Sequence, residues 1–183
     1  MPASIIIISG PPGAGKTSIS QNLAEKSLYD RAVHIKVDDF WQSIRKGYTH
    51  PWLNDSGHQN ETVTEAAAAS ARTFYDGGYE VFVDGVLGPW FLQPWIMVAK
   101  SGIDVRYIIL RPDEDTTVLR ATKRQQREHF PLSTEIIKSV WGSFNNLGEY
   151  EPYVLDTTGQ TIEESTAAIQ DILLGDRYRI TMP

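Results

Sequence analysis

The chain has 183 residues, of which 41% are hydrophobic and 22% are charged, the ordinary composition of a soluble globular protein. Acidic residues outnumber basic ones by 23 to 17, and this net charge of −6 disfavours nucleic acid as a partner, because binding a phosphate backbone normally needs a basic surface. Cysteine is absent, which excludes disulfides, thiolate zinc sites and cysteine nucleophiles. Since no apolar run reaches the roughly 18 residues of a membrane span, we expect a cytoplasmic protein with a single domain over residues 1–183.

Short runs of β-branched and aromatic residues alternate along the chain with segments of helical periodicity. The expected strands cover residues 5–9, 33–37, 79–84, 104–110 and 153–156. The expected helices cover residues 16–29, 61–76, 90–100, 112–127, 134–144 and 161–174, and Ser133 is expected to cap the fifth of them. Connections of this length suit parallel pairing, so the pattern predicts an α/β protein with three layers, in which a five-stranded parallel sheet is flanked by helices.

Residues 10–17 follow the first expected strand and read Gly-Pro-Pro-Gly-Ala-Gly-Lys-Thr, a full match to the phosphate-binding pattern G-x-x-x-x-G-K-[ST]. Glycines let backbone N–H groups turn inward around a phosphate, and the helix that follows adds the positive end of its dipole. The lysine would reach the β- and γ-phosphates, and the threonine hydroxyl would bind Mg²⁺. A chance match would occur in roughly 1% of chains of this size, so the motif predicts a P-loop NTPase fold that binds ATP with Mg²⁺.

This phosphate loop supplies most of the residues expected to bind the nucleotide. They are Gly10, Gly13, Ala14, Gly15, Lys16, Thr17 and Ser18, with Lys16 also assigned to catalysis and Thr17 to the metal. ATP is favoured over GTP because the chain contains no Asn-Lys-x-Asp sequence for guanine recognition.

Acidic residues close two of the expected strands. Asp38 and Asp39 follow the second strand and Asp84 ends the third, at the edge of the sheet where ligands bind in open α/β folds. A carboxylate there can accept the proton of an attacking hydroxyl or hold Mg²⁺ through water, and we assign Asp39 and Asp84 to the metal. The alternative is that these residues only form turns, as aspartate often does.

A basic cluster at helical spacing leads into an irregular segment. Its members are Arg120, Lys123, Arg124 and Arg127, and the lid that they introduce covers approximately residues 124–134. Arginines on such a segment can neutralise the charge of a transferred phosphoryl group. The alternative is a solvated basic face of a helix.

The acceptor is expected to bind at residues 40–60, which have no clean period. Indoles, a tyrosine and two histidines in this region suit a small ligand with apolar and polar groups. These residues are Trp41, Tyr48, His50, Trp52 and His58. His34, inside the second expected strand, is interpreted as a structural histidine.

The chain resembles the small P-loop kinases related to chloramphenicol phosphotransferase, shikimate kinase, gluconate kinase and the zeta toxins. The resemblance spans most of the chain and rests on few residues, which are the phosphate loop, Val-Asp-Asp-Phe at 37–40, residues 119–124 and residues 156–159. The acceptor side departs from these families, because residues 85–89 lack the glycine triplet that binds shikimate and residues 40–60 match no acceptor signature of theirs.

The resemblance also implies roles for individual residues. It implies that Asp38 is the catalytic base, and that Arg124 or Arg127 lies over the phosphates as a catalytic group. It further implies that Arg120 lies near the adenine, with Thr158 and Gly159 against the base.

We therefore expect a kinase, an ATP- and Mg²⁺-dependent phosphotransferase that moves the γ-phosphate to a hydroxyl of a small molecule. One alternative is an ATP-binding regulator or vestigial kinase that transfers no phosphate. Another is a macromolecular acceptor such as an RNA end, against which the acidic net charge weighs. The identity of the acceptor and the oligomeric state stay open at this point.

Overall fold

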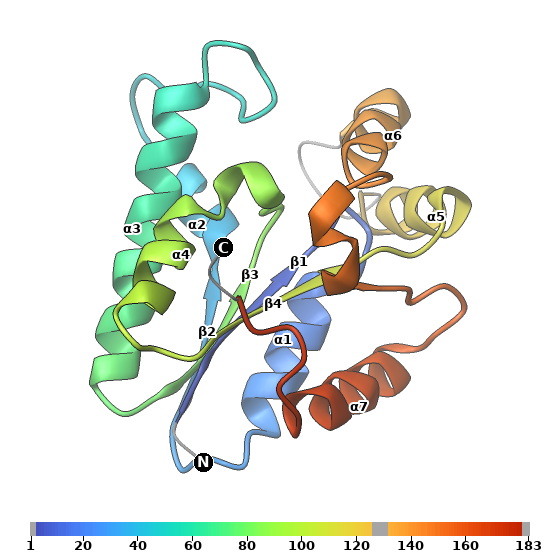
Figure 1. Ribbon diagram of the computed structural model, residues 1–183. Coiled ribbons are helices and arrows are strands. Elements are labelled where there is room, and N and C mark those ends of the chain that lie inside the picture. The colour runs from blue at the N-terminus through green and yellow to red at the C-terminus, as the bar shows by residue number, and fades with distance from the viewer. Residues whose placement is uncertain (1–2, 126–131, 181–183) are drawn as a thin grey trace.

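The computed structural model describes residues 3–125 and 132–180, without the side chains of residues 124 and 125. At its centre is a five-stranded parallel sheet in the order β2-β3-β1-β4-β5 (Figure 1). The strands are β1 Ile5–Ser9, β2 Ala32–Lys36, β3 Glu80–Asp84, β4 Val105–Leu110 and β5 Val154–Leu155. Helices flank the sheet, so the expected three-layer α/β fold is confirmed.

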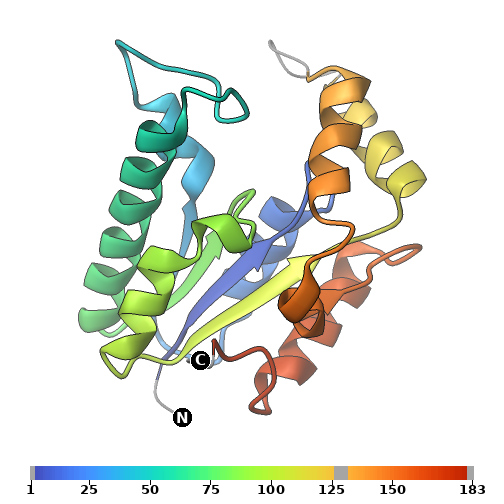
Figure 2. The same ribbon diagram turned by 45° about the horizontal axis from the view of Figure 1, so that its top comes forward.

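The helices cover both faces of the sheet, with α3 and α4 on one side and α1 and α7 on the other (Figure 2). They are α1 Lys16–Glu25, α2 Val37–Gln42, α3 Gly57–Asp76, α4 Gln93–Lys100, α5 Glu114–Gln125, α6 Thr134–Ser143 and α7 Ile162–Leu173, with 3-10 turns η1 Pro89–Phe91 and η2 Gly148–Tyr153. Ser133 caps α6 as expected, because its hydroxyl accepts the N–H of Ile136 at 3.3 Å. None of the helices in the described ranges is long and apolar enough to cross a membrane.

The strand β1 is buried on both of its faces, as its isoleucine run predicts. Ile5 and Ile7 pack in the core on the side of α3 and α4, whereas Ile6 and Ile8 pack on the side of α1 and α7. All four side chains are 0% exposed, because successive residues of a strand point to opposite faces. The phosphate loop therefore leaves a strand that is packed on both faces and paired on both edges.

The end of the second strand differs from the expectation. β2 ends at Lys36, and the helix α2 begins at Val37, so Asp38 and Asp39 lie in the first turn of a helix rather than at a strand end. Carboxylates are stabilised there by the positive end of the helix dipole. The segment predicted to be irregular from residue 40 therefore begins inside a helix.

Other helix boundaries also differ. α1 ends at Glu25, before the expected residue 29, and Leu28 beyond it is 91% exposed and adds nothing to the apolar face of the helix. α3 begins at Gly57, four residues earlier than expected. The helix expected over residues 90–100 is divided into η1 and α4, and Pro94, which has no N–H to donate, stands in the first turn of α4.

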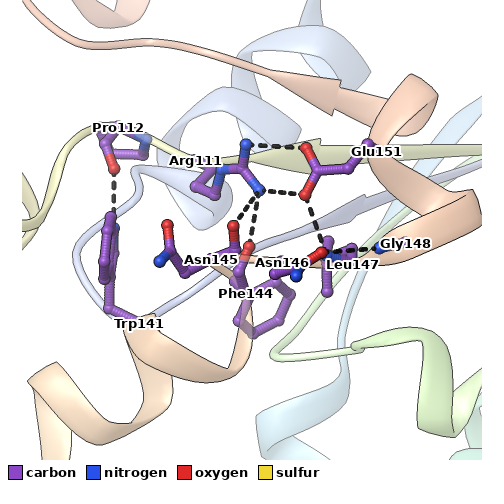
Figure 3. Close-up of polar contacts among 9 residues, drawn as sticks. All are labelled: Arg111, Pro112, Trp141, Phe144, Asn145, Asn146, Leu147, Gly148 and Glu151. Atoms are coloured by element: carbon purple, nitrogen blue, oxygen red, sulfur yellow. Dashed lines mark hydrogen bonds and ion pairs between the residues drawn. The ribbon is translucent and has the colours of Figure 1, made fainter.

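Arg111, directly after β4, ties the sheet to the end of α6 and to η2 (Figure 3). Its Nη1 donates to the Phe144 carbonyl and to Oε1 of Glu151, both at 2.8 Å, and its Nη2 donates to Oε2 of Glu151 at 2.9 Å. One residue after Arg111, the Pro112 carbonyl accepts a hydrogen bond from the Trp141 indole at 2.9 Å. These contacts hold α6 against the strand end beside the phosphate loop.

We expect Arg111→Ala to lower the free energy of unfolding by about 2 kcal/mol at pH 7, the scale of charged hydrogen bonds. The hydrogen bond from Arg111 is the main cause that lowers the pKa of Glu151. A lowered pKa stabilises the fold above the unfolded value, and this contribution is lost as the pH falls through the folded value. The difference in the free energy of unfolding between the wild type and the variant should therefore become smaller below about pH 4.3, the usual glutamate pKa.

Chemical denaturation at pH 7 and at a pH below the usual glutamate pKa measures this difference in the free energy of unfolding. The matched control is Lys138→Ala, which removes an exposed ion pair with Glu114 at 3.1 Å and should cost less than about 1 kcal/mol. An Arg111→Ala protein as stable as the Lys138→Ala protein would contradict the structural role of this network.

Candidate functional site

The phosphate loop is built on three glycines with positive φ angles, two of which leave no room for a Cβ. Gly10, Gly13 and Gly15 have φ angles of 139, 88 and 90°, in the region that side chains disfavour. A Cβ at Gly10 would lie 2.2 Å from the Leu110 carbonyl oxygen, and one at Gly13 would lie 2.4 Å from that of Thr117. The loop is therefore pressed against the end of β4 and against α5, and its backbone is free to surround an anion.

The first turn of α1 completes this cradle. It contains no acidic residue, and no side chain in the described part of the protein caps it, so the positive end of the helix dipole faces the loop. Lys16 is buried, and its Nζ donates to the Pro11 carbonyl at 2.9 Å, which holds the ammonium group over the loop. Ala14 is also buried, whereas Ser18 is exposed. The geometry suits a polyphosphate.

Thr17, Asp84 and His34 form a chain of contacts beside the loop. The Thr17 hydroxyl donates to Oδ2 of Asp84, and the Nε2 atom of His34 lies 3.1 Å from Oδ1 of the same carboxylate. Asp84 is only 3% exposed. The structure thus brings together two residues that the sequence assigned to the metal, and adds a histidine that was interpreted as structural.

These oxygens fit Mg²⁺, which prefers hard oxygen ligands and is usually bound by one or two carboxylates together with substrate phosphates. Within residues 3–125 and 132–180, no group of three or more histidine or acidic side chains could hold a metal alone. A metal held by Thr17 and Asp84 would therefore depend on phosphate oxygens for the rest of its ligands.

The two aspartates of α2 lie in different environments. Asp38 is exposed, and its negative charge adds to burial in raising the pKa of Tyr48 above its ordinary value. Asp39 pairs with Lys36, with 3.4 Å between Nζ and Oδ1, and lines a cavity of about 280 Å³ beside Phe74 at the outer edge of β2. Asp39 is thus directed to Lys36, and its expected metal role stays a prediction.

The expected acceptor region presents a row of aromatic rings. His50 stacks on Trp52 with ring centroids 4.7 Å apart, and Tyr48 meets His50 edge-on at 5.4 Å. The segment is fastened to α3, because Thr49 exchanges hydrogen bonds of 2.8 and 2.7 Å with the Gln59 side chain. In both ribbon views, the segment between α2 and α3 forms a long loop at the upper end of α3 (Figures 1 and 2).

On the opposite side of the phosphate loop, α5 meets the loop after β5. Arg120 Nη2 donates to the Gln160 carbonyl at 2.9 Å, and the Thr158 hydroxyl accepts the N–H of Asp113 at 2.8 Å. Gly159 sits in the same turn with a φ of 71°. The structure therefore brings together the residues that the resemblance assigned to the adenine, and this role stays a prediction.

The assigned lid lies mostly outside the described residues. Arg127 falls in the undescribed range, and Arg124 lies in α5 but its side chain is not described. Their expected catalytic roles stay predictions.

A serine that the sequence did not single out fastens the loop that follows β3. The Ser9 hydroxyl donates to the Leu87 carbonyl at 2.7 Å and accepts the Leu87 N–H at 3.1 Å, and Tyr107 donates to the same carbonyl at 2.6 Å. Further along this loop, the Trp90 ring covers Gly88, where an added Cβ would lie 2.3 Å from the indole. Ser9 directly precedes the phosphate loop, which is the one local signal of its importance.

The family model described as an AAA domain matches residues 6–135. The chain belongs to the AAA domain family. The matched range contains the phosphate loop, Asp38 and Asp84, whereas Thr158 and Gly159 lie outside it.

Individual relatives are P-loop kinases and a resistance protein. A cytidylate kinase of Archaeoglobus fulgidus is 29% identical over an alignment of 132 residues, which covers 67% of this chain and 70% of that protein. The tunicamycin resistance protein of Deinococcus radiodurans superposes with a TM-score of 0.67 at 16% identity, over 93% and 95% of the two chains. Shikimate kinase from Acinetobacter baumannii, in complex with shikimate, gives 0.62 at 17%, over 94% and 93%. The expected P-loop kinase fold is confirmed, and these similarities support a kinase.

A matched pair of glycine variants tests whether the close-packed loop is the nucleotide site. Gly13 and Gly102 have φ angles of 88 and 92°, but a Cβ at Gly102 would have nothing within 4 Å. We expect Gly102→Ala to cost about 1–2 kcal/mol of stability and to keep its affinity for ATP. Gly13→Ala must displace the loop from Thr117, so we expect its ATP affinity to fall at least about tenfold. Titration calorimetry on both proteins decides this, and equal affinities would place the nucleotide elsewhere.

Proposed function

We propose that this protein is an ATP- and Mg²⁺-dependent phosphotransferase that moves the γ-phosphate of ATP to a hydroxyl of a small molecule. One observation carries the proposal: the phosphate loop, the Thr17–Asp84 pair and the exposed carboxylate of Asp38 all lie at or just after the carboxyl ends of the neighbouring parallel strands β1, β3 and β2. Open α/β sheets bind their ligands at this edge. We propose further that residues 1–183 act as one domain of this kind.

In the proposed mechanism, different residues bind the Mg²⁺–nucleotide and accept the proton. The loop backbone and Lys16 hold the β- and γ-phosphates, and Thr17 and Asp84 would hold Mg²⁺, which neutralises phosphate charge when it is bound. Asp38 accepts the proton of the acceptor hydroxyl while the new oxygen–phosphorus bond forms and the bond to the leaving oxygen of ADP breaks. The predicted roles of Arg124 and Arg127 over the transferred group complete this proposal.

The charge of Asp38 favours a hydroxyl over a phosphate as the acceptor group. The name of the cytidylate kinase relative raises the second possibility, a nucleotide acceptor, and the rings of Tyr48, His50 and Trp52 are able to stack on a base. A phosphate acceptor beside Asp38 would meet a like charge, whereas a hydroxyl can donate its proton to the carboxylate. We therefore propose an alcohol acceptor that binds between Asp38 and these rings.

The acceptor is found by measuring ADP release with ATP, Mg²⁺ and a panel of sugars, aromatic alcohols, hydroxylated antibiotics, nucleotides and an RNA oligonucleotide. Acceptor-dependent turnover with an alcohol supports the proposal, and turnover with nucleotides or RNA alone replaces it. ATP binding without turnover on a broad panel would favour the regulator or vestigial kinase.

Adjacent aspartates provide the test of the proposed base. Asp38→Asn should reduce kcat by about 10²–10⁴-fold, the usual contribution of a general base, with little change in ATP affinity. Asp39→Asn removes the same charge one residue later, where the partner is Lys36 at the sheet edge, and should keep kcat within about threefold. Full activity of Asp38→Asn would show that the base is wrongly assigned. A large loss of kcat in Asp39→Asn would show that Asp39 belongs to the active site.

Thr17 offers a second matched pair, for the metal. Thr17→Ser keeps the hydroxyl that contacts Asp84, and we expect its Mg²⁺ dependence to stay close to wild type. Thr17→Val has the same shape without the hydroxyl, so the Mg²⁺ concentration for half-maximal ATP binding should rise about tenfold or more. Titrations of ATP at several Mg²⁺ concentrations measure both, and an unchanged Thr17→Val curve would remove this residue from the metal site.

A further inference from the structure

The carboxylate of Asp84 is held by donors from two different elements. Thr17, on α1, donates to Oδ2, and His34, on β2, lies with Nε2 3.1 Å from Oδ1. An ionised carboxylate can only accept hydrogen bonds, so Nε2 of His34 carries the hydrogen and donates it. Each oxygen of Asp84 therefore has its own donor.

Burial makes this arrangement specific. The side chain of Asp84 is 3% exposed and that of His34 is 15% exposed, and a buried carboxylate is costly unless its oxygens are hydrogen-bonded. Water has little access to Oδ1, so the loss of His34 would leave this oxygen without an equivalent partner from solvent.

The strand register brings the histidine to this place. His34 pairs with Phe82 and Lys36 pairs with Asp84 in the parallel ladder of β2 and β3. Because side chains of a strand alternate between faces, His34, Phe82 and Asp84 share one face of the sheet, and the imidazole reaches along it toward the carboxyl edge. A slip of one residue would place Ile35 there, which has no hydrogen bond to donate.

A second donor matters because a single one does not fix the plane of a carboxylate. Rotation about the last side-chain bond of aspartate is broad, whereas Mg²⁺ requires nearly ideal octahedral geometry. Groups that orient a metal ligand without touching the metal typically change metal affinity or activity by about 10–100-fold. His34 occupies the position of such a group, on the oxygen opposite to Thr17.

We propose that His34 is a positioning residue for Mg²⁺–nucleotide binding, and that it holds the Asp84 carboxylate in the plane that keeps Oδ2 directed at Thr17. The same side chain braces β2, the strand that leads to Asp38, against β3. The inference rests on the Mg²⁺–ATP site of the proposed function and does not depend on the phosphate acceptor.

The test measures ATP affinity by titration calorimetry, with graded Mg²⁺ and with EDTA. His34→Leu removes the donor, and we expect the Mg²⁺ concentration for half-maximal ATP binding to rise about tenfold, with unchanged affinity in EDTA. His34→Gln keeps a donor of similar reach and should recover most of the loss. The matched control is Val33→Ala, on the other face of the same strand in the core beside α3, which loosens β2 but leaves Asp84 its partner. Melting temperatures show which variants are folded.

The outcomes separate this inference from the proposed function. If the wild type binds no ATP in the presence of Mg²⁺, the proposed function fails and the inference fails with it. If the wild type binds ATP but His34→Leu keeps the wild-type Mg²⁺ dependence, or weakens binding equally in EDTA, only the inference is overturned. A Mg²⁺ shift in Val33→Ala as large as that in His34→Leu would also overturn it, since general loosening of β2 would then explain the effect.

Discussion

A loop can surround a phosphate with backbone N–H groups only where side chains leave room, and this constraint governs the whole site. At Gly10 and Gly13 a Cβ would lie within 2.4 Å of the carbonyl oxygens of Leu110 and Thr117. The glycines that give the loop its positive φ angles thus also allow it to pack directly on β4 and α5. The phosphate loop, the strand end and the helix behave as one packed unit, and the site is built outward from it.

Hydrogen bonds over long sequence separations extend this unit to the walls of the site. Ser9 and Tyr107 fasten the loop after β3 through Leu87, and Arg111 fastens α6 and η2 through Glu151. Ser9 ends β1, Tyr107 lies within β4 and Arg111 directly follows it, and both strands are paired with neighbours on both sides. Groups held in this way keep their positions before a ligand arrives, which is the condition for stabilising charge during phosphoryl transfer.

Three aspartates near the ends of β2 and β3 acquire different chemistry from their surroundings. Asp84 is buried between two donors, which suits a metal ligand, and Asp38 is exposed beside Tyr48, which suits proton transfer. Asp39 turns to Lys36 at the outer edge. The sequence placed Asp38 and Asp39 at a strand end, but they lie in a helix, where successive side chains differ in direction by about 100°. That rotation separates the environments of two adjacent identical residues.

The phosphate loop and the layer order could be predicted from the sequence because both depend on local signals. The loop motif occupies consecutive residues 10–17, and the strands are marked by short apolar runs such as Ile5–Ile8. The contacts that complete the site are between residues far apart in the chain, such as His34 with Asp84 and Ser9 with Leu87. No local pattern encodes these pairs, because the register of β2 on β3 and the packing of the loop after β3 decide which side chains meet. The sequence by itself thus determined the nucleotide cradle, and the tertiary structure decided which carboxylates and donors surround it.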